Sequence, residues 1–104
     1  MNNGLRTIGL AKAAGCLLSG EDTVRNAARK GKVKLLLLAS DVGSSGEKRA
    51  RQINETSGAP IIRLSCSKTE LGGAIGLETV SIAAVTDAGF AGMLRAKLES
   101  REEE

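Results

Sequence analysis

Residues 19–39, SGEDTVRNAARKGKVKLLLLA, join a charged segment to an uninterrupted apolar run. The charged segment carries small apolar residues at helical spacing, which predicts a helix that continues to about Lys30 and stops at Gly31. The apolar run falls inside a predicted strand over residues 32–40, and its lack of alternation is typical of a strand covered on both faces. This stretch therefore predicts helices packed against both faces of a sheet.

The predicted helix begins with acids and continues with bases. Ser19 and Asp22 stand in the S-x-x-D relation of a capping-box variant, so we expect Ser19 to cap the helix while its acids lie at the positive end of the helix dipole. Arg25 and Arg29 form an i, i+4 pair on a face separate from the apolar stripe. Two interpretations stay open here. Either the acids only cap the helix and the cations are solvated, or the helix presents its start to a polyanion.

The rest of the chain alternates between helical and strand patterns, with no internal repeat and no long linker. We expect Thr86 or Asp87 to cap the last helix. This order predicts an α/β fold, namely a three-layer α-β-α sandwich with a small mixed four-stranded sheet. The predicted helices cover residues 4–14, 20–30, 46–56, 67–75 and a segment after residue 87, and the predicted strands cover residues 16–18, 32–40, 61–64 and 80–85.

The composition is that of one small domain, residues 1–104, with an aliphatic core. The apolar fraction is 41%, and Phe90, the only aromatic residue, is expected to be buried. Residues 99–104 are acidic, and negative charge is unfavourable at the carboxyl end of a helix. We therefore expect this tail to fray.

No signal for export or for membrane insertion is visible. Arg6 and Lys12 interrupt the apolar positions near the first residue, and the longest apolar run is far shorter than the about 20 residues that cross a bilayer. We therefore expect a cytoplasmic protein in which Cys16 and Cys66 are thiols rather than a disulfide. Two cysteines without any histidine are too few for a structural zinc site. We expect a protein without a metal or a cofactor, and a monomer.

Positive charge is concentrated in the first third of the chain. Residues 1–34 hold seven Lys or Arg against two acids, residues 35–68 hold five against three, and residues 69–104 hold three against seven. Such a distribution is what a polyanion partner needs, although a solvated charged surface has the same signature. One aromatic residue cannot supply a base-stacking platform, so recognition of nucleic acid would rest on shape, phosphates and base edges.

Two glycine-rich motifs have plain structural interpretations. In GSSGEKRA, residues 43–50, Glu47 separates Gly46 from the lysine that a Walker loop requires next to its glycine. We interpret this motif as a strand-to-helix turn with a serine cap. LGGAIG, residues 71–76, does not open a long helix after a strand, so its glycines are interpreted as close-packing and left-handed positions.

Catalysis has weak support in the sequence. Cys66 beside Lys68 could act as a nucleophile at a helix start, but no base partner is visible and the chain has no histidine. The sequence therefore predicts a protein that is not an enzyme.

Three segments, SGEDTVRNAARKGKVKLLLLASD, GAPIIRLSCSKTELGGAIG and AAVTDAGFA, resemble the superfamily of the archaeal ribosomal proteins L7Ae and L30e, in particular its small bacterial YlxQ-like members. The resemblance spans almost the whole chain. Its SGED opening and its K-x-x-LG-x-x-x-G pattern, residues 68–76, are moderately specific together and weak apart. The resemblance implies an α-β-α sandwich that binds kink-turn or related RNA and is not an enzyme.

The resemblance also implies two RNA-contacting segments. In the family, the first turn of the second helix enters the RNA groove beside sheared G·A pairs, and the loop after the third strand contacts an unpaired nucleotide. Gly20 matches the family glycine, whereas Asp22, Thr23 and Asn26 depart from the family pattern of Asn-Glu followed by Lys. The implied site residues are Gly20, Glu21, Asp22, Arg25, Asn26, Arg29, Ser65, Cys66, Ser67 and Lys68.

These residues have side chains that suit contacts to RNA. Glu21 and Asp22 can accept hydrogen bonds from base edges, while Arg25, Arg29 and Lys68 are available for phosphates. A contiguous basic surface that joins these cations would favour RNA, and a contiguous exposed aliphatic surface would favour a protein partner.

Cys66 has two open interpretations, because its side chain can pack on an extruded base or be a buried thiol.

We expect a non-catalytic RNA-binding protein of the ribosomal-protein type that recognises a structured RNA, such as ribosomal RNA or another kink-turn RNA. The alternative is a ribosome-associated or protein-interaction module without specific RNA binding.

Overall fold

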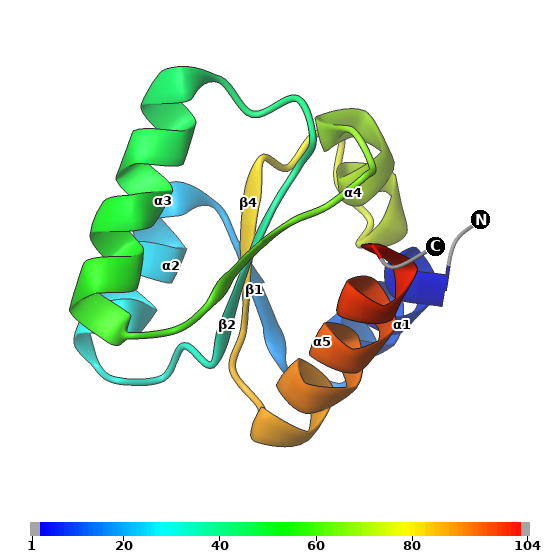
Figure 1. Cartoon of the computed structure of the whole chain (residues 1–104), viewed down its shortest axis with the longest axis horizontal. Coiled ribbons are helices and arrows are strands. Elements are labelled where there is room, and N and C mark those ends of the chain that lie inside the picture. Colours follow the sequence, from blue (N-terminus) through cyan, green and yellow to red (C-terminus); the bar gives the residue numbers. More distant parts are fainter. Residues whose placement is uncertain (1–2, 103–104) are drawn as a thin grey trace.

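Five helices alternate with four strands in residues 3–102, the part of the chain that the structure, a computed structural model, describes (Figure 1). This alternation confirms the predicted order of elements. The helices are α1 (Asn3–Ala13), α2 (Glu21–Arg29), α3 (Ser44–Ser57), α4 (Lys68–Ala74) and α5 (Ala88–Glu102). The strands are β1 (Leu17–Ser19), β2 (Leu35–Leu38), β3 (Ile61–Arg63) and β4 (Ile82–Val85).

The strands form one mixed sheet in the order β1-β4-β2-β3. β2 pairs in parallel with β3, with Leu37 opposite Ile62, and both other pairings are antiparallel. The short strands β1 and β3 therefore lie at the two edges of the sheet.

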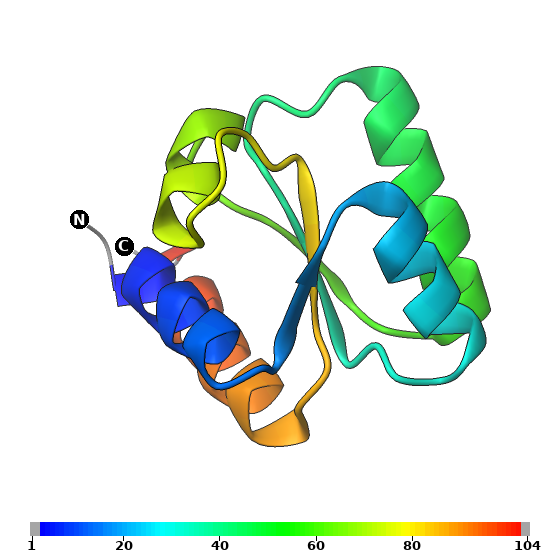
Figure 2. The same ribbon diagram turned by 180° about the vertical axis from the view of Figure 1, so that it is seen from behind.

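Helices α2 and α3 cover one face of the sheet, and helices α1, α4 and α5 cover the other (Figure 1; Figure 2). Val24 of α2 and Ile53 of α3 are buried in the first layer, and Ile8, Leu71 and Leu94 are buried in the second. The structure therefore confirms the predicted α-β-α sandwich with a four-stranded mixed sheet.

Strand β2 contributes to both hydrophobic cores. Its side chains alternate, so that Leu35 and Leu37 join the core under α1, α4 and α5, whereas Leu36 and Leu38 join the core under α2 and α3. All four leucines are at most 2% exposed. This burial confirms that the strand is covered on both faces.

β2 is shorter than predicted. The backbone N–H of Lys32 donates to the carbonyl of Ala27 at 3.0 Å, which turns the start of the predicted strand, residues 32–40, back onto the end of α2. The observed bounds of β1, β3 and β4 differ from the predicted bounds by one or two residues.

Ser19 does not cap α2, and this prediction is wrong. Ser19 is the last residue of β1, where it lies opposite Ala83, and the N-cap of α2 is Gly20 with φ 90° and ψ 140°. The predicted serine cap of α3 is also wrong, because its N-cap is Gly43. Neither helix start has a side-chain cap hydrogen bond.

The starts of α4 and α5 have the side-chain caps that α2 and α3 lack. Ser67 caps α4 in a capping box with Glu70, and the Asp87 carboxylate accepts a hydrogen bond from the Phe90 N–H at 2.9 Å. The position of Asp87 confirms it as one of the two residues predicted to cap the last helix.

Two glycines of LGGAIG, Gly72 and Gly76, have the roles predicted for the glycines of this motif. A Cβ atom on Gly72 would lie 2.7 Å from the carbonyl oxygen of Glu78, so close packing requires glycine there. Gly76 has φ +82°, in the left-handed region.

Phe90 is only partly buried and packs against the core under α5, so it is less buried than expected. Helix α5 continues through residue 102, and the rest of the predicted acidic tail, residues 103–104, lies outside the described residues.

Cys16 and Cys66 are both thiols. Within residues 3–102, no helix has the length and apolar character needed to cross a membrane.

Candidate nucleic-acid interface

The two predicted segments extend from the same end of the sheet. β1, β2 and β3 all finish there and β4 begins there, as their register shows. Backbone hydrogen bonds link the connecting loops, because Gly20 donates to Ile82 at 3.2 Å and Ser40 donates to Cys66 at 2.8 Å. The start of α2 follows one edge strand, and the loop over residues 65–68 follows the other.

The start of α2 exposes backbone and an acidic side chain. Gly20 is exposed, and its positive φ is a conformation that an L side chain rarely adopts. The side chain of Asp22 is 94% exposed, whereas that of Glu21 is 29% exposed. The N-cap residue of α2 is Gly20, which has no side chain to cap the first-turn N–H groups.

Glu21 is the centre of an ion-pair cluster. Its two carboxylate oxygens accept from Arg25 on the next turn of α2 and, at 3.2 Å, from Arg49 on α3. Arg25 also lies 3.4 Å from Asp22. The hydrogen bond from Arg25, and after it the contact with Arg49, lowers the pKa of Glu21 below its usual 4.5, although desolvation partly opposes this shift.

Arg25 pairs with Glu21 and Asp22, so it is not an unpaired cation at the helix start. Arg49 was not among the predicted site residues, and no local pattern could identify it, since it reaches Glu21 across 28 residues of sequence. Its contact depends on the packing of α3 beside α2.

The remaining α2 residues of the predicted site lie on its two flanks. Asn26 lines a groove between α2 and β1, together with Thr23, Lys30 and Lys32. Arg29 lines a second groove, between α2 and α3. Arg29 is nine residues beyond Gly20, which corresponds to about 13 Å along a helix axis, so it lies away from the sheet end where the two segments meet.

The loop over residues 65–68 presents backbone and polar groups. Ser65 is exposed, and Lys68 is partly exposed. Ser67 uses its hydroxyl as the cap of α4, accepting from Glu70 at 3.1 Å. The Lys68 N–H donates to the Asp41 carboxylate at 2.8 Å, so Asp41, which sequence reasoning missed, fixes this loop against the β2–α3 connection.

Cys66 is 4% exposed and belongs to the core under α1, α4 and α5. Of its two interpretations, the structure supports the buried thiol. Only the backbone of Cys66 can take part in this surface.

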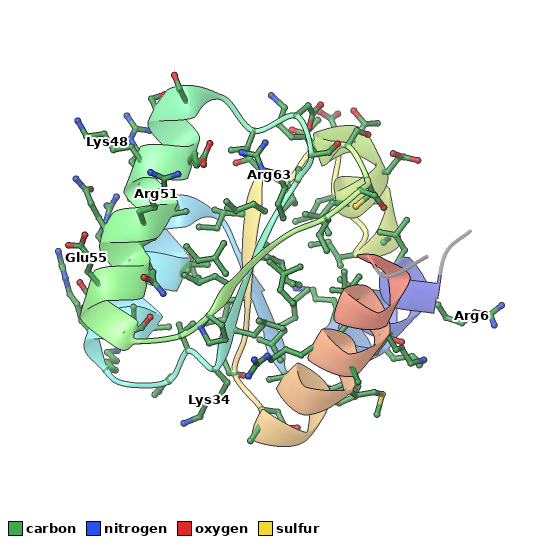
Figure 3. The ribbon with its side chains drawn as sticks, viewed as in Figure 1. Arg6, Lys34, Lys48, Arg51, Glu55 and Arg63 are labelled. Atoms are coloured by element: carbon green, nitrogen blue, oxygen red, sulfur yellow. The ribbon has the colours of Figure 1, made fainter. Side chains whose placement is uncertain are left out.

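A second charge network lies beside this loop. Glu47 on α3 pairs with Arg51 and with Arg63, each at 2.9 Å, and Arg63 also donates to the Ser40 carbonyl at 3.4 Å. Figure 3 shows Arg51 on α3 and Arg63 at the end of β3. These pairs connect α3 to the sheet edge beside the candidate site.

The described residues contain no group of three or more side chains suited to hold a metal ion. The sheet end carries exposed acceptors, an uncapped helix start and a few cations.

Comparisons with known proteins agree with this architecture. The model of the ribosomal protein L7Ae/L30e/S12e/Gadd45 family matches residues 2–94. The chain is 36% identical over 92 residues to the RNA-binding protein YlxQ of Bacillus subtilis, covering 88% of this chain and 91% of that protein.

Two solved structures are similar to this one. A protein described as having unknown function, from Bacillus halodurans, superposes with a TM-score of 0.88 at 32% identity, covering 95% of this chain and 99% of that one. The Giardia lamblia 15.5kD RNA binding protein has a TM-score of 0.75 at 18% identity, covering 92% of this chain and 84% of that one, which shows a shared fold alone.

Proposed function

Because the chain belongs to the ribosomal protein L7Ae/L30e/S12e/Gadd45 family, we propose that it is a non-catalytic RNA-binding protein that recognises a kink-turn or a related structured RNA. The curated relative that shares 36% of its residues is itself called an RNA-binding protein. Structured RNA, including ribosomal RNA, is the proposed partner class.

One observation carries this proposal: the uncapped start of α2 and the loop over residues 65–68 extend from one end of the sheet. Uncapped N–H groups at a helix start are donors that favour anionic or acceptor groups. Gly20 has no Cβ, so the RNA can approach the backbone there. Two such segments at one sheet end can contact two parts of one folded RNA.

We assign the side chains of the proposed interface by their exposure. Asp22 accepts from amino or imino groups on base edges because its carboxylate is nearly fully exposed. Glu21 orients Arg25, which leaves less of its own carboxylate for the RNA. Asn26 and Arg29 contact the sugar–phosphate backbone of the RNA that flanks the recognised bases.

In the loop, Ser65 and Lys68 supply side chains, whereas Cys66 and Ser67 supply backbone. This division follows from the burial of the Cys66 thiol and from the use of the Ser67 hydroxyl as a helix cap. Lys68 is the cation of this segment and contacts a phosphate.

Titration against a labelled kink-turn RNA tests the proposal. The control is a matched RNA in which the sheared G·A pairs are destroyed, and both are titrated at near-physiological salt. We expect tighter binding to the intact motif, despite the departures at Asp22, Thr23 and Asn26 from the family pattern. Equal weak binding to both RNAs would contradict the proposal and favour a protein-interaction or ribosome-associated module.

A further inference from the structure

Four cations crowd the carboxyl end of α2 and the connection to β2. Arg29, Lys30, Lys32 and Lys34, here called the basic end, fall within the sequence RKGKVK, and all four side chains are exposed. Across the described residues, none of the four forms a salt bridge. Their charge is therefore available to a partner.

The basic end lies opposite the candidate interface. α2 runs away from the sheet end that carries Gly20, and Lys34 directly precedes β2 at the other end of the sheet, where its N–H donates to Val85 at 2.8 Å. In Figure 3, Lys34 points away from the ribbon at the lower end of the molecule, whereas Lys48 projects from the upper part of α3.

A groove lies on each flank of α2, and residues of the basic end line part of both grooves. Lys30 and Lys32 line the groove between α2 and β1, which also contains Thr23 and Asn26 of the predicted site region. Arg29 lines the groove between α2 and α3, with Gln52 and Thr56 on its other wall. No acidic side chain lines either of these two grooves.

Stabilisation of the helix dipole accounts for part of this cluster. Arg29 and Lys30 stand in the last turn and at the C-cap of α2, where positive charge is favourable. Lys32 and Lys34 lie beyond the helix, where this effect has faded, and four like charges so close together repel one another. A polyanion would relieve that repulsion.

We propose that the basic end binds the sugar–phosphate backbone of an RNA helix that continues beyond the motif held at the start of α2. This inference rests on the proposed function and adds a second contact to it. The groove between α2 and β1 joins the two regions, since it is lined by Thr23 and Asn26 near the start and by Lys30 and Lys32 at the basic end. The contact is to phosphates, so it adds affinity without base specificity.

The test uses a kink-turn RNA in two forms, one with short stems and one in which each stem is longer by a helical turn. The variant K32Q/K34Q removes two charges from the basic end beyond the helix. The matched control R6Q/K97Q removes two exposed charges from α1 and α5, on the other face of the sheet. Binding of each protein to both RNAs is measured as a function of salt.

We expect the parent protein to bind the long RNA more tightly than the short one, and K32Q/K34Q to lose this gain. Each lost phosphate contact lowers the log–log salt slope by about 0.9, so the variant's slope should fall by about 1.8. Between about 50 and 200 mM salt, that difference is about tenfold in affinity. R6Q/K97Q should retain both the tighter binding to the long RNA and the salt slope of the parent protein.

Two results would overturn the inference: a parent protein that gains nothing from the longer stems, or a K32Q/K34Q variant that changes no more than R6Q/K97Q. Failure of the proposed function has a different signature, which is equal binding to intact and disrupted motifs. The salt slope measured with the long RNA tests the basic end whether or not the protein distinguishes the intact motif from the disrupted one.

Discussion

The two ends of α2 differ in how many of their cations remain available to a partner. At the start, Glu21 and Asp22 engage Arg25, and Glu21 also engages Arg49 of α3. At the basic end, none of the four cations has an ion-pair partner among the described residues. Ion pairs within the protein therefore decide which of the charges counted along the sequence remain available to a partner.

Under the proposed function, this difference separates two tasks along one helix. Base edges are read by acceptors and donors held in fixed positions, and the salt bridges at the start of α2 hold Glu21 and Arg25 in place. Phosphates are attracted by unpaired charge, which lies at the other end. Discrimination and attraction can therefore be changed by different substitutions.

The largest expected effect is that of Gly20→Ala, at the start of α2. With φ 90° and ψ 140°, this position is strained for any L side chain, and we expect the free energy of unfolding to fall by about 1–3 kcal/mol. Binding to the kink-turn RNA should weaken as well, while the basic end keeps its salt dependence. Chemical denaturation and RNA titration measure the two effects.

Gly73→Ala is a matched control, since Gly73 lies in α4 with nothing near its Cβ position and without a positive φ. Alanine in a helix interior should stabilise the protein by about 0.5–1 kcal/mol. Equal stability of the two variants would contradict a special backbone requirement at Gly20.

Asp22→Ala should change the discrimination between intact and disrupted kink-turn RNA rather than the electrostatic attraction to RNA. Losing a base contact costs about 1–3 kcal/mol, so the preference for the intact kink-turn over the disrupted one should shrink by that amount. Glu55→Ala removes the same charge from an exposed position on α3 and should leave the preference intact. An unchanged preference in Asp22→Ala would remove this residue from the interface.

Glu21→Gln should have the smallest effect, and that effect should depend on pH. The folded pKa of Glu21 is lowered by Arg25 and Arg49, so its carboxylate stabilises the folded state above the unfolded value of 4.5. This contribution is lost as pH falls through the lowered pKa. The variant should be less stable than the parent at pH 7 and equal to it in strong acid.

Thermal unfolding over a pH series measures this difference, with Glu55→Gln as a control of equal charge change. A constant gap between parent and Glu21→Gln at all pH values would show that the carboxylate pairs do not contribute to stability through charge.

Much of the fold follows from local sequence pattern. The run of four leucines in β2 has no alternation, which indicated a strand covered on both faces, and both cores now bury it. Ser67 and Glu70 stand at capping-box spacing at the start of α4, and the structure forms that box, although no cap was predicted there. The capping-box contacts lie within the first turn of α4, whereas the burial of β2 depends on helices on both faces of the sheet.

The errors arise where distant parts of the chain decide the outcome. Ser19 has the right spacing for a cap, but pairing with Ala83 in the sheet extends β1 through it and moves the cap to Gly20. The pairing of Glu21 with Arg49 depends on how α3 packs on α2, so Arg49 could not be identified from sequence. The burial of Cys66 likewise depends on three helices that lie elsewhere in the chain.

The order of strands has a consequence for local opening of the protein. β2 pairs on both sides and is buried on both faces, so we expect its amide hydrogens to exchange with solvent only when the whole fold opens. β1 and β3 are three-residue edge strands, and they lead directly into the two proposed RNA-contacting segments. These segments are therefore attached to the parts of the sheet that open most readily, so both can adjust to an RNA while the central strand stays closed.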